Sequence, residues 1–390
     1  MRVIHAPGEM AANAEYLLVG DSDRTRFLRR ILEAVRPDTR CLGFADGIGA
    51  PTAASLLLAE PDWPVALAEL RRAGWPEASL LVMPCPEGDP WSYWSLAEKF
   101  LGEVDFLADL GERHPAFFKT GSDKLSDPEW KRHYCCYCEG LVRRNLPYIR
   151  DVLGRLADRK SRELYGMVLG ASPYALWSHY VKAAFRGLQY FDHVRLGPGD
   201  VVIDGGVFYG SEIPFYLAHL EGEGRVYCVD PFGFDHLSDY ARANMAHFPG
   251  LAQEERLAFG PKTGEVSLPV LGDGQVLGRA VDTAVEGFRT ERFPSTTLDD
   301  FVAGRHLEKI DLIKLDLEGA EEHILPGLID VAREFRPQLA VSIYHTKQHL
   351  WQIPLIIMSK LADYDYYIDV YSCECYETIF YAIPRERAGR

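Results

Sequence analysis

The second half of the chain alternates short apolar runs with longer stretches that have the spacing of amphipathic helices. This alternation is typical of an α/β fold in which a mostly parallel sheet carries helices on both faces. The last two runs are separated by only seven residues, too few for a helical crossover, so we expect them to pair antiparallel. The predicted seven-stranded sheet uses Val201–Ile203, Arg225–Val229, Leu257–Phe259, Leu312–Leu315, Leu339–Ile343, Tyr366–Val370 and Thr378–Ala382.

The first part of the chain has a similar but shorter pattern. An apolar run ends in the polar turn Gly20–Asp23, which offers an N-cap for a helical pattern over 27–35, and another apolar segment follows. Strand, polar turn, helix and strand make a βαβ unit. The strand-like runs are 15–19, 41–44, 79–84 and 104–109. We therefore predict that residues 1–115 form a small Rossmann-like α/β domain.

The stretch between these two patterns has a different character. Residues 116–140 are rich in aromatic and charged side chains without clear periodicity, whereas residues 141–195 carry apolar positions at helical spacing. We predict an irregular and helical linker or cap over 116–189. A larger domain over 190–390 then contains the seven predicted strands.

Composition and charge narrow the class of protein. The 390 residues carry a formal net charge of −15, which repels phosphate backbones and argues against a nucleic-acid-binding face. No apolar stretch reaches the roughly 18–20 residues that span a bilayer, and the first residues lack the pattern of a secretory signal. We expect a cytoplasmic protein with neither a membrane nor a nucleic acid as partner.

The cysteines do not make a regular metal-binding or disulfide pattern. Eight cysteines are too few for a disulfide scaffold, and a cytosol keeps them reduced. Cys135, Cys136 and Cys138 contain a C-x-x-C spacing, and Cys373 and Cys375 form the other cluster. Because a zinc site takes four ligands in regular pairs, reduced and packed cysteines are favoured. A metal site that links the two clusters stays the alternative.

A glycine-rich turn follows the first strand of the larger domain. Asp204 and Gly205 end the strand, and Gly206 and Gly210 follow in the turn. Glycine lets a backbone turn tightly and approach a ligand closely, and ligands of open α/β sheets lie at the carboxyl ends of the strands. The spacing differs from the G-x-G-x-x-G of dinucleotide sites and suits a nucleoside that carries an amino-acid tail.

An acid at the end of the next strand strengthens this interpretation. Asp230 and Pro231 end that strand about 20 residues after the glycines, where a carboxylate can accept hydrogen bonds from both ribose hydroxyls. A solvated strand-end acid or an N-cap is the alternative. The turn and the acid together favour a ligand that contains ribose.

Further polar residues follow two later strands. Asp316 and Glu318 are two positions apart and so point to the same side, where they could share a proton, bind a cation or hold an amino group. Glu321 falls in the first turn of the next helix, and we assign it to the helix dipole. His345 ends the following strand, as a base toward a substrate hydroxyl or as a hydrogen-bonded structural histidine.

Taken together, these segments resemble the FkbM family of methyltransferases. The resemblance runs from Tyr190 to Tyr381, nearly half of the chain. The matching segments are Asp204–Gly210, Asp230-Pro231, Thr296–Phe301, Ile313–Glu321, Ile343–His345 and Glu377-Thr378. The chain departs from the family at Tyr209, where an acid or Asn is frequent, and at Ser211-Glu212, where Asp-Thr is frequent.

The resemblance implies a class I methyltransferase domain that uses S-adenosylmethionine, most often to methylate a hydroxyl oxygen of a sugar or natural product. By position, it implies that Gly206 and Gly210 line the methionine end, Asp230 the ribose, and Asp316 and Glu318 the site near the transferred methyl. The residues expected to hold this cofactor are Asp204, Gly205, Gly206, Gly210, Asp230, Pro231 and Asp316.

Several alternatives for the chemistry stay open. The catalytic residues are expected to be Asp316, Glu318 and His345, with His345 or Asp316 as the base, or with a divalent ion on Asp316 and Glu318. A non-catalytic protein that recognises a nucleoside or glycan is the rival function, whereas the glycine spacing disfavours a nicotinamide-dependent dehydrogenase.

The binding partners are inferred from the same resemblance. We expect a small-molecule or glycan acceptor, and a homo-oligomer stays open. For residues 1–115, the turn Gly20–Asp23 lacks the glycine spacing of a pyrophosphate site, so scaffolding or substrate recruitment is favoured over catalysis.

Overall fold

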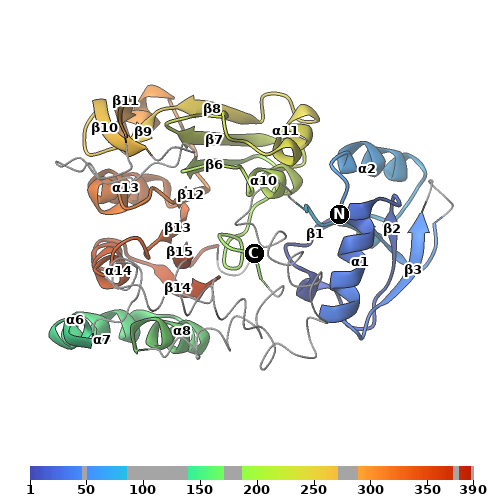
Figure 1. Ribbon diagram of the computed structural model, residues 1–390, viewed down its shortest axis with the longest axis horizontal. Coiled ribbons are helices and arrows are strands. Elements are labelled where there is room, and N and C mark those ends of the chain that lie inside the picture. The colour runs from blue at the N-terminus through green and yellow to red at the C-terminus, as the bar shows by residue number, and fades with distance from the viewer. Residues whose placement is uncertain (46–50, 86–138, 171–186, 271–288, 372–376, 388–390) are drawn as a thin grey trace.

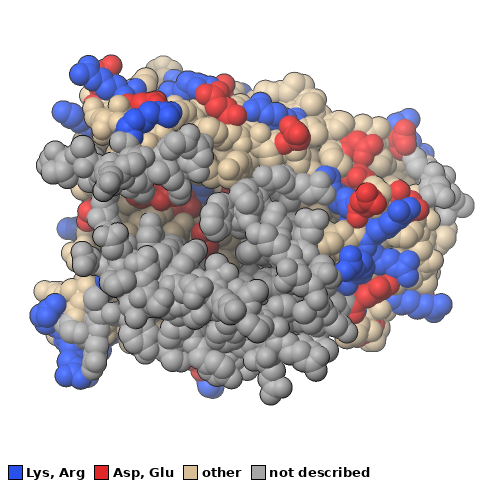
Figure 2. Space-filling view, in the orientation of Figure 1, with Lys and Arg blue, Asp and Glu red and all other residues tan. Residues whose placement is uncertain are grey.

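The computed structural model describes residues 1–45, 51–85, 139–170, 187–270, 289–371 and 377–387. These residues build a smaller N-terminal unit and a larger C-terminal unit, with helices along one edge of the latter (Figure 1). The expected strand at 104–109, the boundary at residue 115 and the cysteines at 135–138 lie outside the described residues. On the face drawn in Figure 2, acidic and basic side chains are interspersed over the described surface.

The N-terminal unit is a parallel five-stranded sheet with the order β1-β5-β4-β2-β3. Its elements are β1 (Arg2–Val3), β2 (Glu15–Val19), α1 (Asp23–Val35), β3 (Arg40–Ala45), β4 (Ser55–Leu58), α2 (Trp63–Arg72) and β5 (Leu80–Val82). The predicted helix and its two flanking strands are confirmed. The predictions missed β4 and α2, which lie between them and β5.

The sequence of α1 accounts for both its start and its orientation. Ser22 and Thr25 form a capping box, in which the Thr25 amide donates to Ser22 Oγ and the Ser22 amide donates to Thr25 Oγ1. Leu28, Ile31 and Leu32 share one helix face and are buried against β2, β4 and β5. Residues of α2 pack against the opposite face of this sheet.

The middle of the chain is helical only in part. α6 (Glu139–Arg144), α7 (Leu146–Arg155) and α8 (Arg159–Gly170) pack against the core of the larger sheet. Leu156, directly after α7, bridges to Tyr366. The prediction of helix through residue 195 is wrong for residues 187–195, which are turns and bends. Their apolar side chains are still buried, because Phe191 packs against Phe215 and Tyr216, with ring centroids 5.4 Å and 5.3 Å apart, and Tyr190 lies in the same core.

The larger sheet has seven strands in the order β14-β15-β13-β12-β6-β7-β8. They are β6 (Asp200–Gly205), β7 (Gly224–Asp230), β8 (Ala252–Arg256), β12 (Leu312–Leu315), β13 (Gln338–Ser342), β14 (Tyr364–Val370) and β15 (Thr378–Pro384). The β15 strand runs antiparallel to both β13 and β14, whereas the other neighbouring strands run parallel. The antiparallel pairing of the last two runs is therefore confirmed.

Two layers of helices cover this sheet. α10 (Ile213–Leu220) contributes to the core on one face. α12 (Leu298–Gly304), α13 (Glu321–Phe335) and α14 (His349–Lys360) contribute to the core on the other face. α11 (Asp239–Ala246) packs beside α10. Among the described helices, none is long and apolar enough to cross a membrane.

The expected strand at Leu257–Phe259 belongs to a different sheet. Ala258–Phe259 form β9, which pairs with β11 (Arg289–Thr296) of a three-stranded sheet completed by β10 (Gly264–Val270). The seventh strand of the large sheet is instead β8, with the sequence AQEER. An edge strand with charged side chains lacks the apolar run on which the prediction depended.

Buried contacts join the two units. Trp63 Nε1 donates to Asn244 Oδ1 of α11 at 2.8 Å, and Tyr240 Oη contacts Ala59 O at 3.2 Å. Trp63 also packs against Phe248, with ring centroids 5.7 Å apart. Because Trp63 is 1% exposed, its indole N–H has been withdrawn from water and depends on this acceptor.

Replacing Asn244 by alanine should therefore weaken the whole fold. A buried donor left without its acceptor costs about 1–3 kcal/mol, and we expect a loss of that size in the free energy of unfolding. Urea denaturation followed by fluorescence measures it. The exposed Glu69→Ala on α2 is the control and should stay within about 0.5 kcal/mol. Equal stability of the two variants would contradict the prediction.

Candidate active site

The candidate site lies where the carboxyl ends of four parallel strands meet. In the sheet, β6 has β7 on one side and β12 on the other, with β13 beyond β12. The connections from β6 therefore diverge at this edge, and such a switch point is where open α/β sheets bind ligands. Asp230 is the last residue of β7, and the predicted residues Gly206, Asp316 and His345 follow the ends of the other three strands.

The glycines in the turn after β6 are required by close contacts within the protein. Gly206 has φ +82°, and a Cβ atom there would lie 1.8 Å from the carbonyl oxygen of Asp316. Gly210 has φ +71°, and its Cβ would lie 2.4 Å from Leu237 Cδ2. The predicted tight turn is present. The close approach that Gly206 permits in this structure is to the backbone after β12.

Asp204 lies beneath this turn and is fully buried. Its Oδ1 pairs with Lys314 Nζ at 3.0 Å, and the same ammonium donates to the Gly206 carbonyl at 2.5 Å. Burial raises the pKa of Asp204, opposed by the Lys314 charge. Burial also works to lower the pKa of Lys314, but nearby carboxylates, Asp204 foremost, outweigh it and hold that pKa above its usual range. Lys314 thus ties β12 to the turn.

The placement of Asp204 revises its expected role. A carboxylate with no exposed surface, held by a buried lysine, supports the turn from below. Its predicted cofactor contact would therefore be indirect, through the Gly206 backbone that Lys314 also holds. Gly205 is part of the same strand end, and a Cβ there would lie 3.1 Å from Leu315 Cδ2.

Asp230 ends β7, and two backbone amides hold its carboxylate. Its Oδ1 accepts the Phe232 amide at 2.8 Å and its Oδ2 accepts the Phe208 amide at 3.2 Å. These two bonds fix the plane of the carboxylate, while each oxygen has capacity for a second donor. Burial raises the pKa of Asp230, and the two amide bonds oppose that rise. Pro231 follows and is half-buried.

Asp316 is held by hydroxyl groups from two other segments. Tyr190 Oη donates to Asp316 Oδ2 at 2.6 Å, and Tyr344 Oη donates to Asp316 Oδ1 at 3.3 Å. Burial raises the pKa of both tyrosines, and the Asp316 charge raises them further. Both phenols therefore keep their protons and act as donors that orient Asp316.

A sharp turn after β12 brings three carboxylates to one histidine. Glu318 and Gly319 have φ values of +52° and +103°, so the chain reverses, and the Leu317 amide donates to Glu321 Oε1 at 2.7 Å. A non-glycine residue in the left-handed region costs about 1–3 kcal/mol and is typical of functional sites. The turn delivers Glu321 to the start of α13 with its carboxylate pointing into the protein.

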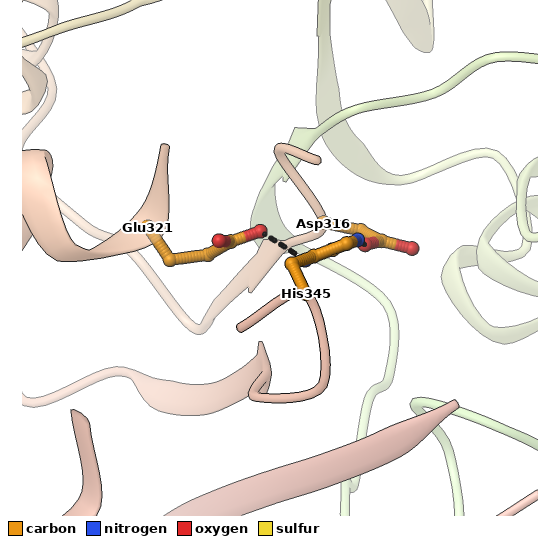
Figure 3. A group of neighbouring side chains, drawn as sticks. All are labelled: Asp316, Glu321 and His345. Atoms are coloured by element: carbon orange, nitrogen blue, oxygen red, sulfur yellow. Dashed lines mark ion pairs between the residues drawn. The ribbon is translucent and has the colours of Figure 1, made fainter. Parts of the chain in front are cut away.

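His345 lies at the centre of this cluster (Figure 3). Its Nδ1 is 3.0 Å from Glu321 Oε1, whereas its Nε2 is 3.3 Å from Asp316 Oδ1 and 3.6 Å from Glu318 Oε2. The helix-dipole explanation for Glu321 is thus incomplete, because this side chain is fully buried and paired with His345. One ring nitrogen is anchored, and the other faces the two acids at the sheet edge.

The cluster changes the proton affinity of its members. Burial alone would lower the pKa of His345, but Glu321 first, then Glu318 and Asp316, outweigh burial and raise it to about 10. Glu377, before β15, has its pKa raised to about 7 by burial and by the Asp316 charge. In this state of the protein, His345 is an imidazolium at neutral pH.

Comparison with known proteins supplies the family of this site. Residues 204–368 match the family model described as the methyltransferase FkbM domain. The chain contains an FkbM methyltransferase domain. The match spans the glycine turn, Asp230, the β12 segment and His345. The resemblance expected from the sequence is confirmed.

Solved structures with some likeness are also methyltransferases by name. The FkbM methyltransferase from Methylobacillus flagellatus KT is 16% identical, with 95% of this chain and 90% of that chain covered and a TM-score of 0.46. Aeropyrum pernix fibrillarin, in complex with natively bound S-adenosyl-L-methionine, is 11% identical over 50% and 71%, with a TM-score of 0.29. A SAM-dependent methyltransferase from Aquifex aeolicus is 14% identical over 60% and 96%, with a TM-score of 0.27. No curated protein matches the chain.

The FkbM domain also has a group that could hold a cation. Among the described residues, Asp316, Glu321 and His345 each place a ligand atom within 4.8 Å of the others. Nitrogen and carboxylate oxygen ligands suit several divalent metals. A protonated His345 is the alternative to a metal ion, because its ring nitrogens lie 3.0 Å from Glu321 Oε1 and 3.3 Å from Asp316 Oδ1.

Several residues of this site were given no role in the sequence prediction. Lys314, Tyr190 and Tyr344 were not singled out, although each contacts or supports the predicted carboxylates. One signal was present, because a lysine inside the apolar run Leu312–Leu315 must be paired when it is buried. The tyrosines gave no such signal, since aromatic residues are ordinary in a core.

The His345 cluster should make stability depend on pH in a defined direction. The pKa of His345 is raised from 6.5 to about 10, so its ion pairs stabilise the fold fully below about pH 6.5 and are lost as pH rises toward 10. We expect the stability gap between the wild type and His345→Gln to be largest near pH 6 and to shrink toward pH 10. Urea unfolding across this range measures the gap, and a gap that widened with pH would refute the assignment.

Proposed function

We propose that this protein transfers a methyl group from S-adenosylmethionine to a hydroxyl oxygen of a sugar or natural product. The family match supports methyl transfer, and the geometry of the site supports an oxygen acceptor. The observation that carries the proposal is His345, anchored at Nδ1 by Glu321 and directed by Nε2 toward the sheet edge that also holds Asp316. A base anchored in this way is what removal of a hydroxyl proton requires.

The site residues divide into those that would hold the cofactor and those that would act on the acceptor. Asp230 would accept the ribose hydroxyls, and the turn at Gly206 would adjoin the methionine end. When bound, S-adenosylmethionine supplies an electrophilic methyl carbon on a positively charged sulfur. The acidic surroundings of Asp316 and Glu318 favour a ligand that carries positive charge.

Charge in the site would control when His345 becomes a base. The three carboxylates hold its proton in the free protein. A cationic ligand that shares these carboxylates lowers the pKa of the imidazole, so that His345 can lose its proton before the acceptor reacts. The neutral Nε2 would then take the proton of the acceptor hydroxyl. Glu321 stabilises the imidazolium that results.

Calorimetry and a transfer assay test the proposal. Binding of S-adenosylmethionine and S-adenosylhomocysteine should be in the micromolar range, and methyl transfer should follow with some member of a panel of hydroxylated sugars and natural products. Failure to bind either compound would overturn the proposal. Binding without transfer would favour the rival function, a non-catalytic protein that recognises a nucleoside or glycan.

A chelator arm of the same assay addresses the metal. Transfer that stops with EDTA and returns with Mg²⁺ would assign a divalent ion to the group of Asp316, Glu321 and His345. Transfer that persists in EDTA would assign removal of the acceptor hydroxyl proton to His345 without a metal ion.

A further inference from the structure

The N-terminal unit has a pocket of its own. It has a volume of about 340 Å³ and lies where β2 and β4 end. Among the described residues, it is lined by Val19, Gly20, Asp21, Ser22, Leu58, Glu60, Asp62, Trp63 and Ala66. The residues come from the ends of the two strands, from the loops that follow them and from the first turn of α2.

The topology of the sheet explains why a pocket forms at this place. Along the chain, β2 is followed by β3 on one side, and the chain then returns to place β4 on the other side of β2. The connections after β2 and β4 therefore leave in opposite directions and open a crevice between them. This is the position at which parallel α/β sheets bind ligands.

The polar part of the pocket is acidic. Glu60, after β4, accepts a short hydrogen bond from Ser22 Oγ, after β2, and so joins the two sides of the crevice. Asp62 adds a further carboxylate to the lining, and so does Asp21, which is paired with Arg26 at 2.7 Å. Even with the charge of Arg26, these carboxylates leave a net negative charge that repels phosphates and other anions. The start of α1 does not offset them, because Ser22 caps the helix and accepts the Thr25 amide.

A metal ion fits the pocket poorly as well. Among the described residues, the group of Asp316, Glu321 and His345 is where three potential metal ligands converge, and the acids of this pocket do not converge in that way. The rest of the lining is apolar and includes Leu58, Trp63 and Ala66. Carboxylates beside half-buried apolar side chains, Val19 and Ala66, match a sugar, which has hydroxyl donors at its edge and a C–H face.

We propose that this pocket binds a sugar, neutral or amino-substituted, with Glu60 as the main acceptor of its hydroxyl groups. The site is separate from the methyltransferase site, and the proposal does not rest on the proposed function. Trp63 lines the pocket and also donates to Asn244 of α11, so the binding site is built on the contact between the two units.

Ligand-observed NMR and calorimetry on the full chain test the proposal with glucose, galactose, mannose, rhamnose and glucosamine. At least one of these sugars should bind the wild type at millimolar concentration. Glu60→Gln removes the charged acceptor and should weaken that binding about tenfold or more. Ala66→Phe should block it by filling the pocket without a change of charge. Unfolding curves show that each variant is folded.

Two control variants locate the binding. Asp23→Asn removes the same charge at the start of α1, but Asp23 is fully exposed and does not line the pocket, so sugar binding should be unchanged. His345→Gln should also leave sugar binding unchanged, because His345 does not line this pocket. Loss of binding in that variant would place the sugar in the acceptor site instead. The proposal is overturned if none of the five sugars binds, or if Glu60→Gln and Ala66→Phe both bind like the wild type.

Discussion

His345→Ala should slow methyl transfer by about 10²- to 10⁴-fold, the range that a positioned acid–base group supplies. The affinity for S-adenosylhomocysteine should change by a much smaller factor, because His345 faces Asp316 and Glu318 rather than the Asp230 side of the sheet edge. Single-turnover kinetics separates the chemical step from binding. A variant with unchanged turnover would remove His345 from the mechanism.

Glu321→Gln refines this first prediction, because the amide keeps the size of the side chain and removes its charge. Glu321 is the largest contributor that raises the pKa of His345, so the variant should shift the pH–rate profile toward lower pH as well as reduce the maximal rate. A loss of fold alone would not move the profile. Glu334→Gln is the matched control on the same helix, where the side chain is exposed, and should behave like the wild type.

Asp230→Asn should weaken binding of S-adenosylhomocysteine by about 10- to 100-fold, since hydrogen bonds to a charged group contribute about 1.5–3 kcal/mol. The reason is geometric, because the Phe208 and Phe232 amides orient this carboxylate toward the edge of the sheet. Calorimetry measures the change, and the rate at saturating cofactor should fall much less. Such a pattern would mark Asp230 as a binding residue rather than a catalytic one.

The control for this second prediction is an acid on the same loop. Asp235 is exposed and forms an ion pair with Arg256, with 2.6 Å between the charged atoms. Asp235→Asn should therefore leave the affinity unchanged. Equal losses in both variants would point to the net charge of the loop. No loss in either would contradict the assignment of Asp230.

Most of the strands that the sequence predicted contain a run of apolar residues. β6, β7, β12 and β13 are buried between two layers of helices, so each appears as a run of apolar residues. β8 at the edge and β10 of the small sheet have charged, partly exposed residues and gave no such run. Strands rich in charged residues thus escape the sequence signal, and β4, although apolar, was missed as well.

The sequence also predicted only part of the candidate site, namely the residues whose position a strand end fixes. Acids at strand ends, such as Asp230 and Asp316, could be located because a strand end fixes their position. Glu321 could not, since its inward direction depends on the left-handed turn at Glu318, which no local preference of that residue predicts. Tyr190 reaches Asp316 across 126 positions of sequence, and such contacts arise only from the tertiary fold.

The buried contacts between the two units also limit where the protein can be divided by gene engineering or limited proteolysis. Trp63, Leu67 and Leu70 of α2 form one apolar cluster with Ala218 and Phe248 of the FkbM domain. A shortened chain that began after residue 186 would uncover that apolar surface and leave Asn244 facing water in place of the indole. Such a fragment is expected to self-associate, so useful truncations of this protein should keep residues 1–85.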